Sequence, residues 1–266
     1  MPGDLEQPLE NSGEEAEQPL ILVPVDAEDI SRRRRRILTT CGVAALIALG
    51  TAGFLYKRSM DPIHAQESYD AGVRLLKIAR YSQAILSFDR AVGLKPDFPD
   101  AYLMRARAYV GDGRTVPAIT DFTRVIKMRP NDPQPLLERG RAYMDKKDYQ
   151  AAIDDATRAL AMDSNLAAAY NLRGTAVRTM GNLRGALQDF DRSVKLEPKE
   201  LNYFERGITY QMMGEHQLAI ADFSEVIAFA PDEAAGYFSR AKSKREIGDF
   251  RGAEEDHLQG RIIDGR

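Results

Sequence analysis

The sequence GTAVRTMGNLRGALQDFDRSVKLEP, residues 174–198, contains the pattern that decides the fold. Within it, Ala186 and Phe190 lie four residues apart, and the chain repeats this pair at a nearly constant interval. The alanines are separated by 34, 34, 34, 33 and 34 residues, at Ala84, Ala118, Ala152, Ala186, Ala219 and Ala253. The residues four places later are Phe88, Phe122, Ala156, Phe190, Phe223 and His257. Such a period indicates an array of short, similar units.

Small residues, tyrosines and prolines keep the same register. A small residue precedes each alanine by 12 residues, at Gly72, Ala106, Gly140, Gly174, Gly207 and Ala241. Tyrosine follows three residues later at Tyr109, Tyr143 and Tyr210, and most units close with proline, at Pro96, Pro130, Pro198 and Pro231. We expect two helices joined by a turn in each unit, because small residues allow close helix packing. One pair cannot bury both faces, so the pairs must stack.

This register resembles the tetratricopeptide-repeat family over residues 65–266. The resemblance implies an all-α fold, a right-handed α-solenoid of six helix-turn-helix repeats whose first helices line a concave groove. The predicted repeats span residues 65–98, 99–132, 133–166, 167–199, 200–233 and 234–266. We number them 1 to 6.

Two charged positions depart from the family pattern in repeats 2 to 6. An arginine precedes the small residue at Arg105, Arg139, Arg173, Arg206 and Arg240, and an aspartate lies sixteen residues later at Asp121, Asp155, Asp189, Asp222 and Asp256. Repeat 1 lacks both, with Ala71 and Ser87 in their places. We therefore predict that each arginine pairs with the aspartate of its own repeat. The alternative is two solvated side chains, for which a pair contributes only about 0–1 kcal/mol.

The resemblance also implies which side chains meet a partner in the groove. The polar candidates are Arg107, Arg141, Asn171, Thr175, Arg178, Gln211, Lys242 and Arg245, and the apolar candidates are Tyr69, Leu103, Leu137 and Phe204. Because the polar set is mostly cationic and Arg binds carboxylates with two hydrogen bonds, we expect a protein or peptide partner with an acidic segment or a C-terminal carboxylate. The chaperone-binding clamp of the family is not reproduced, since Tyr69 and Val73 occupy two of its positions.

Residues 37–56, ILTTCGVAALIALGTAGFLY, contain no charge and match the thickness of a bilayer when helical. We expect a transmembrane helix in residues 32–58, followed by a linker over 59–64. A cleavable signal is disfavoured, because no small-residue pair follows the apolar run. Five arginines at 32–36 outnumber the two cations Lys57 and Arg58, so the N-terminus is expected in the cytoplasm and the repeats across the membrane, as in a bacterial inner membrane. In a mitochondrial outer membrane the repeats could instead face the cytosol.

Residues 1–31 carry nine acidic side chains and no basic one, which predicts a disordered acidic tail. Within the tail, EQPL occurs at residues 6–9 and again at 17–20, either as a docking motif or by chance. The net charge of −3 disfavours nucleic-acid binding. Cys41 is the single cysteine, and the histidines 64, 216 and 257 lie far apart, so no metal site, cofactor or catalytic motif is expected.

The sequence therefore predicts a membrane-anchored protein-interaction scaffold and not an enzyme. We expect a role in bacterial envelope assembly or secretion. The alternative is a receptor whose repeats face the cytosol and capture preproteins or chaperones. The sequence does not identify the partner or the oligomeric state.

Overall fold

The computed structural model describes residues 27–265, which form twelve helices and no strand. The EQPL motifs of the predicted tail lie outside these residues. The chain divides into two compact units, Met1–Arg58 and Ser59–Arg266. The helices are α1 (Ala27–Lys77), α2 (Tyr81–Leu94), α3 (Pro99–Gly111), α4 (Thr115–Met128), α5 (Gln134–Asp145), α6 (Tyr149–Met162), α7 (Ala167–Thr179), α8 (Leu183–Leu196), α9 (Glu200–Met213), α10 (His216–Phe229), α11 (Ala234–Glu246) and α12 (Phe250–Asp264).

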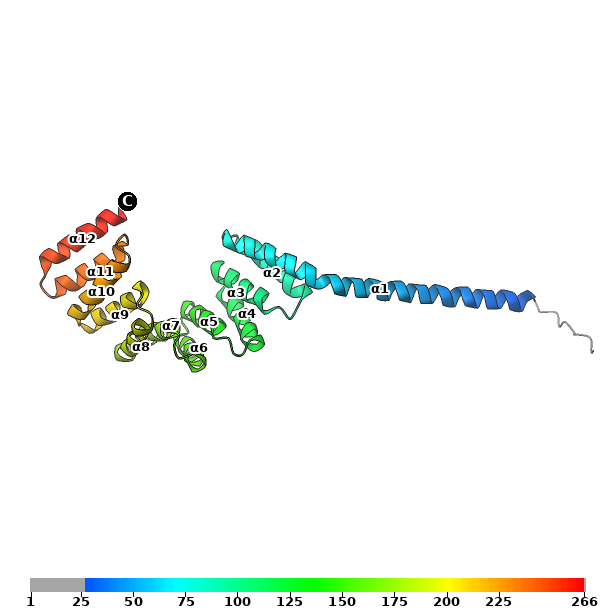
Figure 1. Ribbon diagram of the computed structural model, residues 1–266, viewed down its shortest axis with the longest axis horizontal. Coiled ribbons are helices and arrows are strands. Elements are labelled where there is room, and N and C mark those ends of the chain that lie inside the picture. The colour runs from blue at the N-terminus through cyan, green and yellow to red at the C-terminus, as the bar shows by residue number, and fades with distance from the viewer. Residues whose placement is uncertain (1–26, 266) are drawn as a thin grey trace, which may run out of the picture. The chain divides into compact units, whose positions relative to one another are not determined.

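The second compact unit is a solenoid of helix pairs. Each helix from α2 to α12 packs against the next one along the chain. Figure 1 shows the pairs following one another along a curve. The odd-numbered helices α5, α7, α9 and α11 also touch one another in succession, and they lie on the inner side of that curve. The all-helical solenoid predicted from the 34-residue period is therefore confirmed.

The periodic residues form the core between the helices of each pair. Phe88, Phe122, Phe190 and Phe223 are all buried, as are the alanines four residues before them. In repeat 4 the absence of a side chain at Gly174 admits the ring of Phe190, because a Cβ atom there would lie only 2.9 Å from Phe190 Cε1. Small residues in the first helix are thus needed for the aromatic ring of the second.

The five predicted arginine–aspartate pairs are all present. In each, the Nε and Nη2 atoms donate to the two carboxylate oxygens, at distances between 2.6 and 2.9 Å. The aspartates are buried. The arginine comes from the first helix and the aspartate from the second helix of the same repeat, so each pair joins the two helices of its repeat. We call these five pairs the arginine–aspartate ladder.

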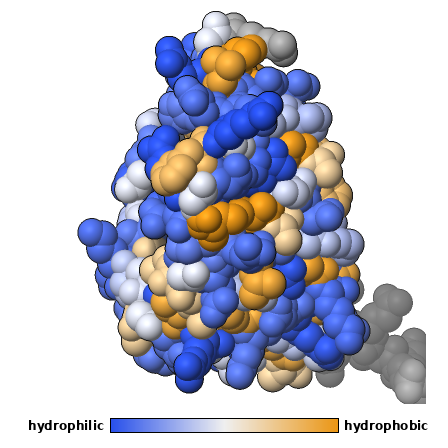
Figure 2. Space-filling model, turned by 90° about the vertical axis from the view of Figure 1, so that its left-hand side faces the viewer, coloured by the Kyte–Doolittle hydropathy of each residue, from blue (hydrophilic) through white to orange (hydrophobic). Residues whose placement is uncertain are grey.

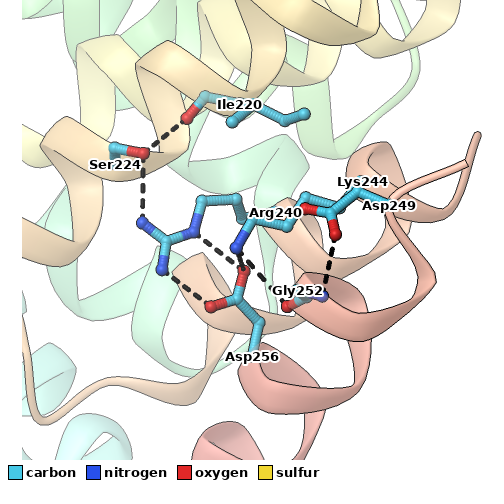
Figure 3. A network of polar contacts seen from close by, with 7 residues as sticks. All are labelled: Ile220, Ser224, Arg240, Lys244, Asp249, Gly252 and Asp256. Carbon is cyan, nitrogen blue, oxygen red and sulfur yellow. Dashed lines mark hydrogen bonds and ion pairs between the residues drawn. The ribbon is translucent and has the colours of Figure 1, made fainter. Parts of the chain in front are cut away.

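Each ladder arginine also reaches the preceding repeat, which the sequence did not predict. Its Nη1 atom donates to a side chain on the second helix of the preceding repeat. This acceptor residue comes directly after the phenylalanine of the repeated Ala–Phe pattern, or after Ala156 in repeat 3. These acceptors are Asp89, Thr123, Thr157, Asp191 and Ser224. Figure 3 shows this arrangement in the last repeat, where Arg240 bridges Asp256 and Ser224. One guanidinium therefore connects three helices and links neighbouring repeats.

The ladder aspartates differ in their electrostatic surroundings. Burial raises the pKa of Asp222 above its ordinary value, against the hydrogen bonds from Arg206, and the nearby Asp191 adds to the rise. Burial opposes ionisation of Asp256 as well, but hydrogen bonds from Arg240 and Lys244 lower its pKa below the ordinary value. The second cation is Lys244, whose Nζ atom lies 2.9 Å from Asp256 Oδ2. Asp256 therefore ionises more readily than Asp222.

The first compact unit contains the N-terminal part of α1. Its described apolar side chains, including Leu38, Leu46 and Leu49, are exposed. Among the described residues, no helix combines the length and the apolarity needed to cross a membrane. The membrane helix predicted over residues 37–56 is therefore not supported by the structure.

The turns inside the repeats yield a first prediction. In four repeats the turn after the first helix contains a glycine with positive φ, whereas repeat 1 places Ala79 there with φ 56° and repeat 3 places Lys147 there with φ 61°. A side chain costs roughly 1–2 kcal/mol in this region. We expect Lys147→Gly to raise the free energy of unfolding by about 0.5–1 kcal/mol, measured by urea denaturation. Lys146→Gly, one residue earlier with φ −76°, is the control and should not raise it.

The ladder yields a second prediction. Arg139→Ala leaves the buried carboxylate of Asp155 without its cation, which should lower the free energy of unfolding by about 3–5 kcal/mol. The double variant Arg139→Met with Asp155→Leu should recover most of this loss, since an apolar pair can replace a buried ion pair. Arg251→Ala breaks an exposed pair with Glu255 and should change stability by less than about 0.5 kcal/mol. Equal losses for Arg139→Ala and Arg251→Ala would contradict a structural role for the ladder.

Candidate protein-binding groove

Two adjoining clefts open on the inner side of the solenoid. The larger, which we call the central cleft, has a volume of about 720 Å³ and is lined by Val110, Arg141, Met144, Asp145, Ala168, Asn171, Leu172, Thr175, Glu197, Lys199, Leu201, Asn202 and Glu205. The smaller, of about 370 Å³, is lined by Arg107, Val110, Phe122, Gln134, Glu138, Arg141, Ala142 and Asp145. Since three residues line both, the clefts form one groove across α3, α5, α7 and α9.

Arg141 lies where the two clefts meet. Its side chain is exposed, and it makes no ion pair or hydrogen bond with the part of the chain that the structure describes. A guanidinium in such a position has all its N–H groups available. Arg141 is therefore the predicted site residue best placed to bind an acidic group.

Two other predicted cations are already engaged by carboxylates of the next repeat. Arg107 donates to both oxygens of Glu138, at 2.8 and 2.5 Å, and this hydrogen bond raises the pKa of Arg107 despite its partial burial. Arg178 pairs with Glu205 at 2.5 Å and also donates to the Glu205 carbonyl at 2.9 Å. Both ion pairs connect neighbouring first helices on the inner side, so they stabilise the groove's shape.

Of the amide and hydroxyl candidates, two line the central cleft and one contacts the next repeat. Asn171 and Thr175 line the central cleft, and Asn171 Nδ2 donates to Asn202 Oδ1 over 3.1 Å. Gln211 instead donates to Ser239 O and Ser243 Oγ of the next repeat. The groove thus brings together the candidates Arg107, Arg141, Asn171 and Thr175, which come from repeats 2 to 4.

Lys242 and Arg245 lie on α11, where both are exposed. They line neither cleft. The predicted site is therefore not one continuous surface from repeat 2 to repeat 6.

The apolar candidates mostly belong to the core. Leu103 and Leu137 are buried, while Tyr69 packs against the rings of Phe88 and Phe98. Phe204 meets Phe223 edge to face, with ring centroids 5.8 Å apart. The accessible apolar surface of the central cleft comes instead from Val110 and Leu201, which are 41% and 58% exposed.

Sequence reasoning missed the groove carboxylates Glu138 and Glu205. A signal was present, because each directly precedes a ladder arginine in the repeated tripeptide ERG, at residues 138–140 and 205–207. It also missed Lys199, which forms an ion pair with Glu197 at the rim of the central cleft. The groove is consequently less cationic than the predicted residues alone indicate.

Hydrophobic side chains are dispersed over the face shown in Figure 2, as separate patches among hydrophilic residues. Among the described residues, no group of three or more His, Cys, Asp or Glu side chains is arranged to hold a metal ion. The groove is an open surface on which apolar, amide, cationic and carboxylate groups lie side by side.

Comparison with known families agrees with this geometry. The family model described as tetratricopeptide repeat matches residues 69–133 and 137–200. These segments are similar to tetratricopeptide repeats. The structure adds two further helix pairs, α9 with α10 and α11 with α12, packed in the same way. Proteins built from tetratricopeptide repeats are protein-interaction scaffolds.

Several solved tetratricopeptide-repeat-like structures share the fold. PilW, a widely conserved type IV pilus biogenesis factor, is 18% identical with a TM-score of 0.67, over 73% of this chain and 91% of that chain. PilF of Pseudomonas aeruginosa is 15% identical with a TM-score of 0.65, over 77% and 95%. MamA of Desulfovibrio magneticus RS-1 is 21% identical with a TM-score of 0.57, over 62% and 94%. At these identities the likeness concerns the fold alone. A comparison with curated protein sequences gives no match.

Proposed function

We propose that the chain is a scaffold that binds a partner protein by seating a peptide or helix of it in the central cleft. The observation that carries this proposal is the unengaged Arg141 beside the amides of Asn171 and Asn202. The amide of Asn171 can bond the backbone of an extended segment, and the exposed Leu201 can cover one of its apolar side chains. Asn202 is buried and orients Asn171, since it donates to Glu197 O and accepts from Asn171. A scaffold of this kind has no catalytic role.

The proposed partner segment carries a carboxylate at the point that meets Arg141. Arg107 and Arg178 are committed to Glu138 and Glu205, so one acidic group and not an acidic stretch is what the central cleft accommodates. A C-terminal carboxylate or a single Asp or Glu satisfies this requirement. The rest of the segment is polar or moderately apolar, as the lining of the cleft is.

We further propose that residues 37–56 anchor the chain in a membrane. Their support is the uncharged sequence and the exposure of Leu46 and Ile47, together with arginines 32–36 on one flank. The arginine excess places the N-terminus in the cytoplasm and the repeats outside it, in a bacterial envelope. The type IV pilus biogenesis factor among the similar structures favours envelope assembly or secretion. The alternative is a cytosol-facing receptor for preproteins or chaperones.

A photo-crosslinking amino acid at position 141 tests the groove. We expect it to capture a discrete partner in intact cells of the source organism, whereas the same amino acid in place of the exposed Arg251 should not. With that partner purified, Arg141→Ala should weaken binding by roughly tenfold or more, the loss of a charged hydrogen bond of about 1.5–3 kcal/mol. Unchanged affinity in Arg141→Ala, with the partner crosslinked equally from both positions, would reject the groove.

Membrane fractionation tests the anchor. The wild-type chain should remain in the membrane pellet after alkaline extraction, and Leu46→Arg with Ile47→Arg should release it, because each arginine costs about 2.5–3.5 kcal/mol at the centre of a membrane helix. Leu218→Arg in the repeats, where the leucine is 48% exposed, is the matched control and should stay in the pellet. Protease added to spheroplasts should digest the repeats, and protection would favour the cytosol-facing alternative. Wild-type protein in the soluble fraction would exclude an anchor.

A further inference from the structure

The second helices of the repeats carry a feature that the groove does not use. Arginines recur at exact 34-residue intervals in repeats 1 to 4, at Arg90, Arg124, Arg158 and Arg192. We propose that these four residues, which we call the arginine row, form a second interaction surface that binds an extended acidic segment of a protein. This surface is independent of the central cleft.

The ladder fixes where the row lies. Each row arginine directly follows the residue that accepts a hydrogen bond from the next repeat's ladder arginine, as Arg124 follows Thr123 and Arg158 follows Thr157. The row therefore occupies one register position on α2, α4, α6 and α8. These even-numbered helices lie on the outer side of the curve in Figure 1. The row follows the stack of repeats along a face different from that of the groove.

The row arginines are exposed and their charge is largely uncompensated. Among the described residues, neither Arg90 nor Arg192 has a carboxylate within ion-pair distance. Arg124 lies over the ring of Tyr102, 4.4 Å from its centroid. Arg158 is 3.7 Å from Asp155, whose two oxygens already accept from Arg139.

The acidic neighbours of the row are engaged elsewhere. Asp89 accepts from Arg105 at 2.7 Å, and Asp191 accepts from Arg206 at 2.9 Å. Exposed lysines three residues after two of the row members, Lys127 and Lys195, add positive charge. Each ladder arginine also faces its own buried aspartate, so Asp89 and Asp191 still contribute one negative charge each beside Arg90 and Arg192. The positive excess therefore lies at Arg124 and Lys127 in repeat 2 and at Lys195 in repeat 4.

A recess beside the row can receive a side chain. A cleft of about 600 Å³ in repeat 2 is lined by Arg105, Ile119, Thr120, Asp121, Thr123, Arg124 and Lys127. Two exposed cations, Arg124 and Lys127, stand at this cleft and can donate to an oxygen acceptor. The recess suits a carboxylate-bearing side chain of Asp or Glu.

The spacing of the row favours a polypeptide. Successive row helices pack on the odd-numbered helix between them and not on each other, so successive row arginines are separated by about 10–20 Å. An extended chain rises about 3.3 Å per residue, so about three to six residues of it would span one interval. The row is also finite, because repeats 5 and 6 place Glu225 and Gln259 at this register position. A segment of roughly ten to eighteen residues would span the row.

The test measures fluorescence anisotropy of a labelled dodecamer of glutamate mixed with the full-length chain at low salt. We expect oligo-glutamate to bind and a dodecamer of glutamine not to bind. The variant with all four row arginines replaced by Gln should lose at least tenfold in affinity. The charge-matched control replaces Lys146, Lys147, Arg251 and Arg261 by Gln and should change affinity less than twofold. Glu225→Arg extends the row into repeat 5 and should tighten binding.

Three results would overturn the proposal. The first is that oligo-glutamate does not bind. The second is an equal loss of affinity in the row variant and in its charge-matched control, which would show that only the net charge of the protein matters. The third is tighter binding of anionic lipid vesicles or duplex DNA through the same four arginines. Thermal melting of each variant confirms that it is folded. The row variant should still bind the purified groove partner with unchanged affinity, so failure of the groove and failure of the row can be told apart.

Discussion

The bidentate contact between a ladder arginine and the buried aspartate of its repeat is the constraint on which the solenoid depends. A carboxylate as buried as Asp155 is tolerable only when a cation meets both of its oxygens, and Arg139 does so at 2.6 and 2.7 Å. Two parallel hydrogen bonds fix the rotation of one helix against the other more narrowly than apolar packing does. The third bond, to Thr123, extends this restraint to the preceding repeat. Curvature, and with it the groove, follows from repeated use of one geometry.

The ladder also determines which charges are available for binding. On the outer helices it turns acidic groups such as Asp89 and Asp191 toward the ladder arginines and leaves the row arginines exposed. On the inner helices, Glu138 and Glu205 form ion pairs with Arg107 and Arg178 and neutralise them. Electrostatic character is therefore distributed unevenly, with a mixed groove inside and a cationic row outside. A partner that recognises one face has little reason to compete for the other.

The sequence predicted the helix pairs, the core phenylalanines and the ladder because each depends on a single period and on residues of fixed type. The third bond of the ladder could not be predicted, since its acceptor is Asp, Thr or Ser, and any short polar side chain satisfies an N–H donor. The side chains that are free in the groove were harder to predict than the third bond. Leu137 occupies a family groove position but is buried, because the next repeat's first helix covers it as part of the core that includes Leu172. Whether a groove side chain is free depends on the neighbouring repeat, which a single repeat's pattern does not contain.

The ends of the ladder show the same dependence of one repeat on the next. Repeat 1 has Ala71 where the other repeats have the arginine, and among the described residues no second helix precedes it for an arginine to reach. In repeat 6 the acceptor position holds Leu258, which is 59% exposed, in place of the Asp, Thr or Ser of repeats 1 to 5. Within the described chain, a polar acceptor thus occurs only where a following arginine uses it. The acceptors are themselves partly exposed, with the side chains of Asp89 and Asp191 at 44% and 56%, so water can satisfy an unused one. The ladder arginines are largely buried, and it is their third N–H donor that needs an acceptor from the preceding repeat.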